Sequence, residues 1–272
     1  MIIIRGFLFC SLALLLLSAA PVPVSAQNNG FPLSIHQLVG EDYRYAIDFL
    51  FFKKLAQGQL RFTETAQPGV YRAELTGQTL GVAAWLAGER TQNYTSLMEM
   101  TADGSLRSIE HVSKVFKSRR GKSQNRMRRF HYDYAQGKIY DEKLIDGVSR
   151  SKRESDIPND RQPVDLLTAF YNLRIGVYGA LVRGAHMRIP TFSSKGFSEI
   201  EVKVLTLERH YEQRYFPARG LLVQVKIDPE IFDTGSGNLF VWFDDAGVPG
   251  RGIVEELIGL GDARGYLDRE GL

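Results

Sequence analysis

The sequence predicts a mainly β protein, either a curved antiparallel sheet or a partly open β-barrel, with one central amphipathic helix. Three observations support this prediction. Apolar and polar residues alternate with a period of two along several segments. Short turn signals that contain glycine separate these segments, and one segment near the middle has helical periodicity instead. Strands joined by short turns form meanders and hairpins, so we expect antiparallel pairing.

The expected strands each have one apolar and one polar face. In the clearest example, Ile200, Val202 and Val204 alternate with charged residues, which is typical of a half-buried strand. The same alternation occurs at residues 60–63, 71–76, 129–134 and 221–227. Turn signals fall at residues 67–69, 102–105, 136–137, 146–147, 218–220 and 245–247.

The amphipathic helix is expected at about residues 163–178. Four apolar side chains recur at the spacing of one helix face: Leu166, Phe170, Leu173 and Val177. Pro163 suits a first helical turn, because its missing N–H has no intrahelical partner there. Asp165 lies near the positive end of the helix dipole and Arg174 further on, so we expect both to have structural roles.

The first 26 residues have the pattern of a cleaved secretory signal peptide. Arg5 gives a short charged start, an apolar run covers residues 7–17, and residues 24–26 place small side chains at a cleavage position. The run is shorter than the ~20 residues that cross a bilayer. An uncleaved anchor is the alternative, but two prolines after the run break any continuing helix. We therefore expect export to the periplasm.

The mature chain is expected to be a single β-rich domain over residues 41–272, after a poorly ordered segment at 27–40. Cys10, the only cysteine, lies inside the apolar run, so the mature protein has no thiol and is not a lipoprotein. Removal of the signal peptide leaves a net charge of +2, which indicates no particular class of partner. The remaining length is ample for a hydrophobic core.

A basic segment between Lys114 and Arg129 is the densest charge feature, with eight basic and no acidic residues. Such a segment can bind an anionic surface, for example phospholipid headgroups or lipopolysaccharide phosphates. The candidate contacts are Arg119, Arg120, Lys122, Arg126, Arg128 and Arg129. The alternative is a solvated hairpin tip that happens to be basic. Export disfavours a nucleic acid as partner.

No motif indicates a metal site, a cofactor or a catalytic centre. The histidines do not recur at the two- or four-residue spacing of a local metal site: they are His36, His111, His131, His186 and His210. The chain contains no Gly-x-Ser-x-Gly elbow, zinc-binding His-Glu-x-x-His helix or Walker-type phosphate loop. We therefore expect no cofactor and favour a non-enzymatic protein, although a site assembled from distant residues stays open.

Three blocks resemble the bacterial family called domain of unknown function 3108. They are Tyr43-Arg-Tyr45 followed by Gly58, the helix at residues 165–174, and Val241-Trp-Phe-Asp-Asp245 followed by Val248-Pro249 and Arg251. The resemblance implies a secreted β-rich domain with one central helix, and it brings no established activity or catalytic residue. More loosely, the expected architecture is similar to that of the outer-membrane lipoprotein carriers LolA and LolB.

These observations leave three hypotheses. The leading one is a non-enzymatic envelope protein that binds an amphiphilic or hydrophobic ligand, or a partner protein, in the concavity of its sheet. Trp242, Phe170 and Tyr171 are its candidate contacts, and ordinary core packing is the alternative for each. The second is a module that docks on anionic envelope surfaces through the basic segment. The third is a hydrolase whose site is built from dispersed residues.

Overall fold

The computed structural model describes residues 31–49, 52–81, 84, 88–232, 234–257 and 261–268. The expected signal peptide lies outside the described residues. The elements in chain order are α1 (Ile35–Leu38), β1 (Glu41–Phe49), β2 (Phe52–Glu64), β3 (Val70–Thr79), β4 (Glu89–Met100), β5 (Leu106–Arg119), β6 (Lys122–Asp133), β7 (Lys138–Ile145), β8 (Val148–Asp156), α3 (Leu166–Arg174), β9 (His186–Ser193), β10 (Gly196–Val204), α4 (Leu207–Glu212), β11 (Leu221–Lys226), the 3₁₀ helix η1 (Pro229–Ile231), β12 (Asn238–Phe243), β13 (Pro249–Leu257) and β14 (Gly261–Leu267).

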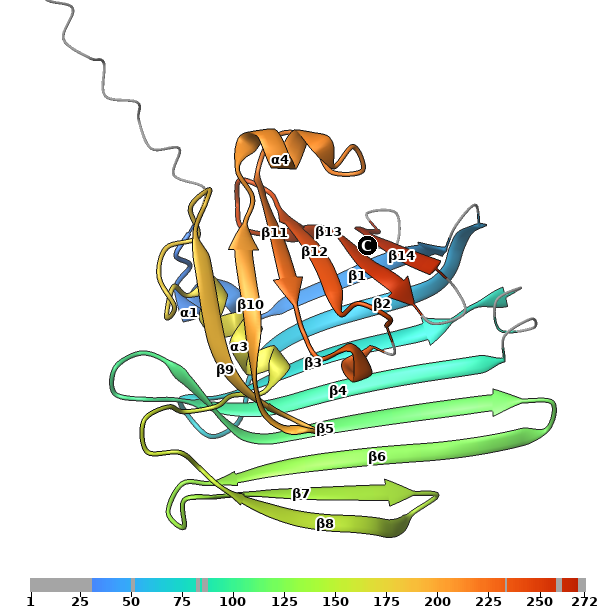
Figure 1. Ribbon diagram of the computed structural model, residues 1–272, viewed down its shortest axis with the longest axis vertical. Helices are drawn as coiled ribbons and strands as arrows, with labels where there is room; N and C mark the ends of the chain where they lie inside the picture. The colour runs from blue at the N-terminus through green and yellow to red at the C-terminus, as the bar shows by residue number, and fades with distance from the viewer. Residues whose placement is uncertain are drawn as a thin grey trace, which may run out of the picture.

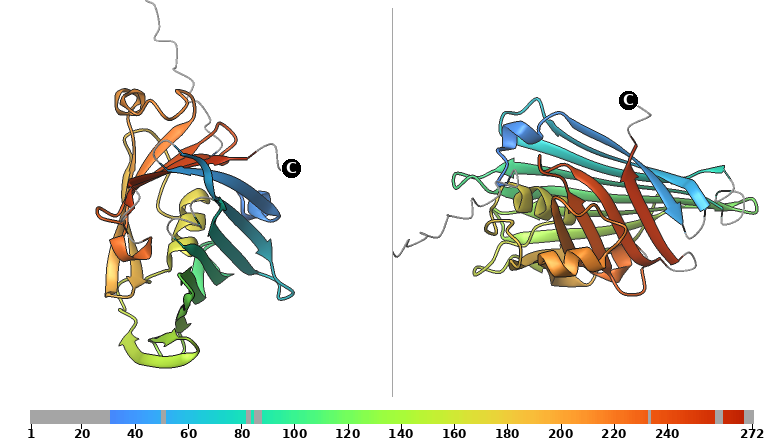
Figure 2. Two further views of the ribbon diagram at one scale, coloured as in Figure 1. Left: turned by 90° about the vertical axis from the view of Figure 1, so that its right-hand side faces the viewer. Right: turned by 90° about the horizontal axis from the view of Figure 1, so that it is seen from above.

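All of these strands belong to one antiparallel sheet, in the order β8-β7-β6-β5-β4-β3-β2-β1-β14-β13-β12-β11-β10-β9. The sheet is strongly curved, and its two halves face each other across α3 (Figure 1). We call β1–β8 the N-terminal wall and β9–β14 the C-terminal wall; they join where β1 pairs with β14 (Figure 2). The predicted mainly β, curved antiparallel architecture with a central helix is thus confirmed, and the sheet stays open between β8 and β9.

Side chains bring the two open edges together at one end of the sheet. Arg153 and Arg128 both donate hydrogen bonds to the carbonyl oxygen of Ser194 in the β9–β10 turn, over 2.6 and 3.3 Å. The ring of Phe130 on β6 packs edge-on against Phe192 on β9, with centroids 5.6 Å apart. The edges are therefore linked by side chains where no backbone ladder joins them.

The central helix is shorter than predicted at both ends. It begins at Leu166 because the Asp165 side chain caps it, and the preceding Val164 forms a parallel bridge with Thr191 on β9. It ends at Arg174, and Gly176 then takes a φ of +82°, which is typical of the residue after a helix end. The predicted range of 163–178 is wrong by these flanking residues.

Asp165 fixes the first turn of α3 to the N-terminal wall. Its buried carboxylate accepts hydrogen bonds from the N–H groups of Leu167 and Thr168. The hydroxyls of Ser96 on β4 and Ser108 on β5 donate to the same carboxylate. This anchoring explains why a charged side chain can be buried at the centre of the molecule.

Arg174 fixes the last turn of α3 to both walls. Its guanidinium forms two hydrogen bonds, of 2.6 and 2.7 Å, with the carboxylate of Glu41 at the start of β1. It also donates to the carbonyl of Gly247 between β12 and β13. Arg174 is 0% exposed and the Glu41 side chain only 7% exposed, so this is a buried ion pair.

The segment just before β1 is ordered over the residues that the structure describes, contrary to the expectation of a poorly ordered 27–40. Leu33 donates its N–H to the carbonyl of Arg174, and Leu38 in α1 is completely buried. These contacts lie in the same apolar cluster as the inner face of β2–β4. Residues 31–40 therefore close the end of the core beside α3, which the mixed composition of the segment did not indicate.

We predict that R174M destabilises the fold strongly, because it leaves the buried Glu41 carboxylate without its cation. The expected loss in the free energy of unfolding is about 3–5 kcal/mol, measured by urea denaturation. The double variant E41Q/R174M removes both charges and should lose less than R174M alone. A double variant that is as unstable as R174M, or less stable, contradicts this account.

We predict a pH-dependent contribution from Asp165. Burial acts to raise the pKa of this carboxyl group, but neighbouring His111 and hydrogen bonds from Ser108 and Ser96 outweigh burial and lower the pKa. A lowered folded-state pKa contributes stability above the unfolded value of about 4, and this is lost as pH falls through the folded value. D165N should cost about 2 kcal/mol at neutral pH.

The matched measurement compares the two proteins by urea unfolding at neutral pH and at pH ~3. The stability difference between wild type and D165N should shrink at the lower pH, because only the wild type loses the contribution of an ionised Asp165. A difference that does not change between the two pH values contradicts the prediction.

Candidate functional site on the concave face

Helix α3 covers only part of the concave face (Figures 1 and 2). Beneath it, inward-facing side chains of both walls are no more than 1% exposed: Phe62, Ala73, Ser96, Met98, Leu221, Val223 and Phe243. Ser96 contacts the helix cap directly, so these positions define the inner face of their strands. Since side chains alternate along a strand, every second residue from them points to the same side.

Further along the same strands, inward-facing residues are only partly buried, and the apolar ones among them pack against the margin of the core beneath α3. They are Gly58, Leu75, Gly77 and Gln92 on the N-terminal wall, and Val225, Leu239, Val241 and Gly252 on the C-terminal wall. A side chain added at Gly77 would meet no atom within 4 Å of its Cβ. We call these eight positions the open concave face.

The open concave face has defined borders. On the side away from α3, Phe49, Ala56 and Ala263 form a small apolar cluster where β1, β2 and β14 meet. Where β11 leads into β12 in the C-terminal wall, the segment at η1 crosses to β4, and Tyr94 donates to the carbonyl of Ile231 over 2.6 Å. The face is thus bounded by α3, by this cluster and by η1.

The chemistry of the concave side changes steadily across the N-terminal wall. One cross-strand row of neighbours consists of Gly58, Gly77, Gln92, Val115, Arg126 and Ile145. The adjacent row consists of Leu60, Leu75, Tyr94, Ser113, Arg128 and Lys143. Both rows begin with small or apolar residues on β2–β3 and reach basic residues on β6–β7.

The three aromatic residues predicted as ligand contacts do not come together. Tyr171 is completely buried in the core, stacked on Phe62 with centroids 4.0 Å apart. Phe170 packs beside it and against Phe243 under the C-terminal wall. Trp242 lies on the opposite face of β12, so the prediction of one shared cavity is wrong.

The Trp242 side chain packs on the outer face of the C-terminal wall. Its Nε1–H donates to the carbonyl of Arg219 over 2.7 Å, in the connection between α4 and β11. Its ring lies so close to Gly250 that a Cβ there would be 2.7 Å from it. Phe216 and Phe240 belong to the same outer cluster. The connection between α4 and β11 covers the outer face of β12, which explains why both faces of this strand are apolar.

The six predicted anionic-surface contacts also divide between two faces. Arg126 and Arg128 point to the concave side, whereas Arg129 points to the convex side and lies 3.4 Å from Glu110. Arg128 is occupied by Asp141, which also binds Arg153. Burial acts to raise the pKa of Asp141, but these two guanidinium groups outweigh burial and lower the pKa.

The remaining members of the predicted set carry unpaired charge. Arg119, Arg120 and Lys122 are exposed at the β5–β6 turn, and Arg126 is half-buried. Within the described part of the chain, none of these four side chains has an ion-pair partner. Four of the six predicted contacts thus carry charge that no ion pair neutralises among the described residues, and their binding to an anionic surface stays a prediction.

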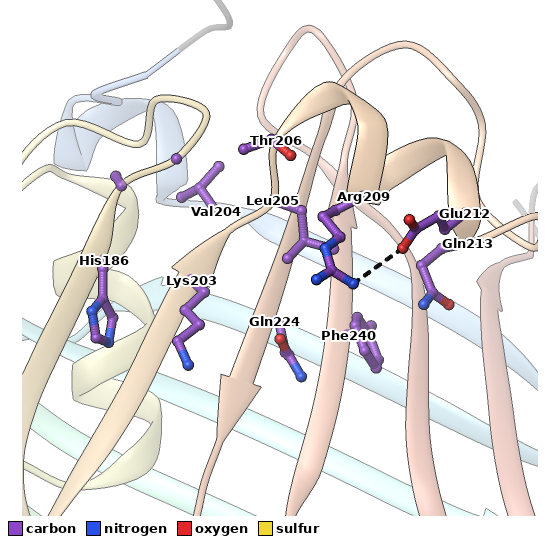
Figure 3. Close-up of a pocket in the computed structure, with 12 residues that line it drawn as sticks. His186, Lys203, Val204, Leu205, Thr206, Arg209, Glu212, Gln213, Gln224 and Phe240 are labelled. Atoms are coloured by element: carbon purple, nitrogen blue, oxygen red, sulfur yellow. Dashed lines mark hydrogen bonds and ion pairs between the residues drawn. The ribbon is translucent and has the colours of Figure 1, made fainter.

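A separate open pocket of about 540 Å³ lies on the outer face of the C-terminal wall, below α4 (Figure 3). Phe240 is one of its lining residues, and its Lys, Arg and His side chains already have partners. Lys203 and His186 both lie within 3.0 Å of Glu201, and Arg209 pairs with Glu212 over 3.3 Å. It thus has little free charge for a ligand.

Ser96, His111 and Asp165 have the residue types of a catalytic triad but a different arrangement. Ser96 lies in the middle: its hydroxyl donates to Asp165, and its oxygen is 2.8 Å from Nδ1 of His111. All three are buried, and Asp165 is engaged in capping α3. This cluster is therefore structural. No group of three or more potential metal ligands occurs among the described residues.

The geometry defines an open, barrel-like antiparallel β protein with a helix inside its concave face. The chain belongs to the family described as "Protein of unknown function (DUF3108)", whose model matches residues 44–265. It is also similar to the crystal structure of a beta-barrel-like protein of domain of unknown function DUF1849 from Brucella abortus. That match has 10% identity and a TM-score of 0.47, and covers 85% of this chain and 96% of the other.

A search of curated proteins found no match. In the described residues, no helix has the length and apolar character needed to cross a membrane. The comparisons thus establish the family and leave the function to be argued from the site.

We predict that W242F lowers stability without affecting binding on the concave face. Loss of the hydrogen bond to the Arg219 carbonyl should cost about 1 kcal/mol in the free energy of unfolding. Binding of an apolar fluorescent probe should be unchanged, because Trp242 points to the outer face. Weaker probe binding by a folded W242F protein would indicate that the probe binds on the outer face, which contradicts this account.

Proposed function

We propose that this protein is a non-enzymatic binding protein of the bacterial envelope, and that it binds an amphiphilic or hydrophobic molecule on the open concave face. One observation carries the proposal. Inward-facing residues of both walls are fully buried beneath α3 and partly exposed beyond it. The fold therefore holds apolar side chains on a concave surface without covering them completely.

Physical chemistry favours an apolar occupant for this surface. Leu75, Val225, Leu239 and Val241 project into the concavity from facing walls. Burial of their exposed area is worth roughly 25 cal/mol per Å². Small-molecule sites are typically concave, mainly apolar and largely preformed, as this face is.

The envelope location rests on the amino-terminal sequence. Residues 1–26 combine a charged start, an apolar run and small residues before the cleavage position. A protein exported in this way meets lipids and other amphiphiles, which suits the proposed ligand class.

The alternative, docking on an anionic surface through all six basic residues, has less support. A docking surface needs its charges on one side, and Arg126 and Arg129 point to opposite sides of β6. Arg128 is engaged by Asp141. The remaining unpaired cations are better explained as part of the concave site.

The test fills the open concave face and measures probe binding. Gly77 has free space for a side chain, so G77F should fold and occupy the site. Wild-type protein should bind N-phenylnaphthylamine saturably, with a fluorescence increase. G77F should weaken this affinity by about tenfold or more, which is ~1.4 kcal/mol or more.

The matched control is Q78F, which adds the same ring at the next residue of β3. Gln78 is exposed and points to the convex side, so the affinity of Q78F should equal that of the wild type. Absence of saturable binding by the wild type, or an equal loss in both variants, would contradict the proposed function.

A further inference from the structure

Half-buried cations lie on the same side of the sheet as the open concave face. Arg126 on β6 belongs to the cross-strand row that begins with Gly58, and Lys143 on β7 ends the row that begins with Leu60. Within the residues that the structure describes, neither cation has an ion-pair partner. Arg119 and Lys122 are paired across the β5–β6 hairpin end and extend the basic area.

On the concave side of β6 and β7, the charge that no ion pair neutralises is mainly positive. Asp141 lies beside these cations, but Arg128 and Arg153 already neutralise it. Gln92 and Val115, which separate Gly77 from Arg126 along one row, are uncharged. Partly buried charges are less screened than fully exposed ones, so Arg126 and Lys143 attract an anion more strongly than loop cations do.

The spacing allows one molecule to meet both regions. Gly77 on β3 and Arg126 on β6 are three strands apart in the same row. At ~4.8 Å between neighbouring strands, this separation is ~14 Å. An alkyl chain lying across β3–β5 would therefore place its head at β6–β7, close to Arg126 and Lys143.

We propose that the ligand is an anionic amphiphile, bound as a single molecule with its chain on the open concave face and its charged head at Arg126 and Lys143. This inference rests on the proposed function and specifies its ligand class. The shared chemistry is an alkyl chain with a phosphate or carboxylate head. Charge complementarity then sets the orientation of the ligand.

The experiment compares dodecyl phosphate with dodecanol, which has the same chain and no charge. Displacement of N-phenylnaphthylamine should show that wild-type protein binds dodecyl phosphate about tenfold more tightly, as expected for two partly exposed ion pairs. The variant R126Q/K143Q should lose this preference and retain its affinity for dodecanol.

The matched control is K114Q/R129Q, which removes two positive charges from the convex side of β5 and β6. It should keep the preference for dodecyl phosphate. Loss of the preference in this control would show that overall charge is responsible, and would overturn the inference. The free energy of unfolding of each variant verifies that it is folded.

The remaining outcomes separate the two proposals. Equal wild-type affinity for dodecanol and dodecyl phosphate overturns the anionic class and leaves the proposed function intact. Binding of neither compound overturns both. Inorganic phosphate that competes as strongly as dodecyl phosphate indicates a free-anion site. Binding to phosphatidylglycerol vesicles, together with no preference for dodecyl phosphate over dodecanol in solution, indicates membrane docking. Either of these last two results also overturns the inference.

Discussion

Two buried charged side chains hold α3 against the sheet, Asp165 at its first turn and Arg174 at its last. Asp165 joins the helix to β4 and β5, and Arg174 joins it to β1 and to the turn after β12. Both walls therefore depend on the same nine-residue element. An open sheet of this kind cannot bury its inner face by closing on itself, so the helix supplies the missing half of the core.

The length of this helix determines where the sheet stays open. With nine residues α3 is ~14 Å long, whereas the 14 residues of β5 extend over ~46 Å. One helix cannot cover strands of that length, and α1, the apolar cluster at Phe49 and η1 cover only the margins. The uncovered interior follows from this mismatch. Its position beside the basic ends of β6 and β7 gives the surface two chemically different parts.

The sequence predicts where the strands and the central helix lie better than it predicts which side of each strand faces the concavity. Period-two alternation located strands such as β10 and β11, and Asp165 and Arg174 marked the helix. Both faces of β12 are apolar, so alternation could not show that Trp242 points outward beneath the α4–β11 connection. Alternation does separate Arg126 and Arg128 from Arg129. It could not reveal which side is concave, since the curvature depends on contacts between distant strands. For the same reason, the sequence alone could not reveal the cross-strand row that joins Gly77 to Arg126.

The central claim is that a ligand chain lies inside the curve of the sheet. Nuclear magnetic resonance with stearic acid that carries a nitroxide near the end of its chain tests this most directly, because the nitroxide broadens nearby amide signals. The account predicts the strongest broadening at Gly77 and Val241, and a nitroxide moved next to the carboxylate should shift it toward Arg126. Broadening centred on Phe240 and Trp242 would place the ligand on the outer face and contradict the account.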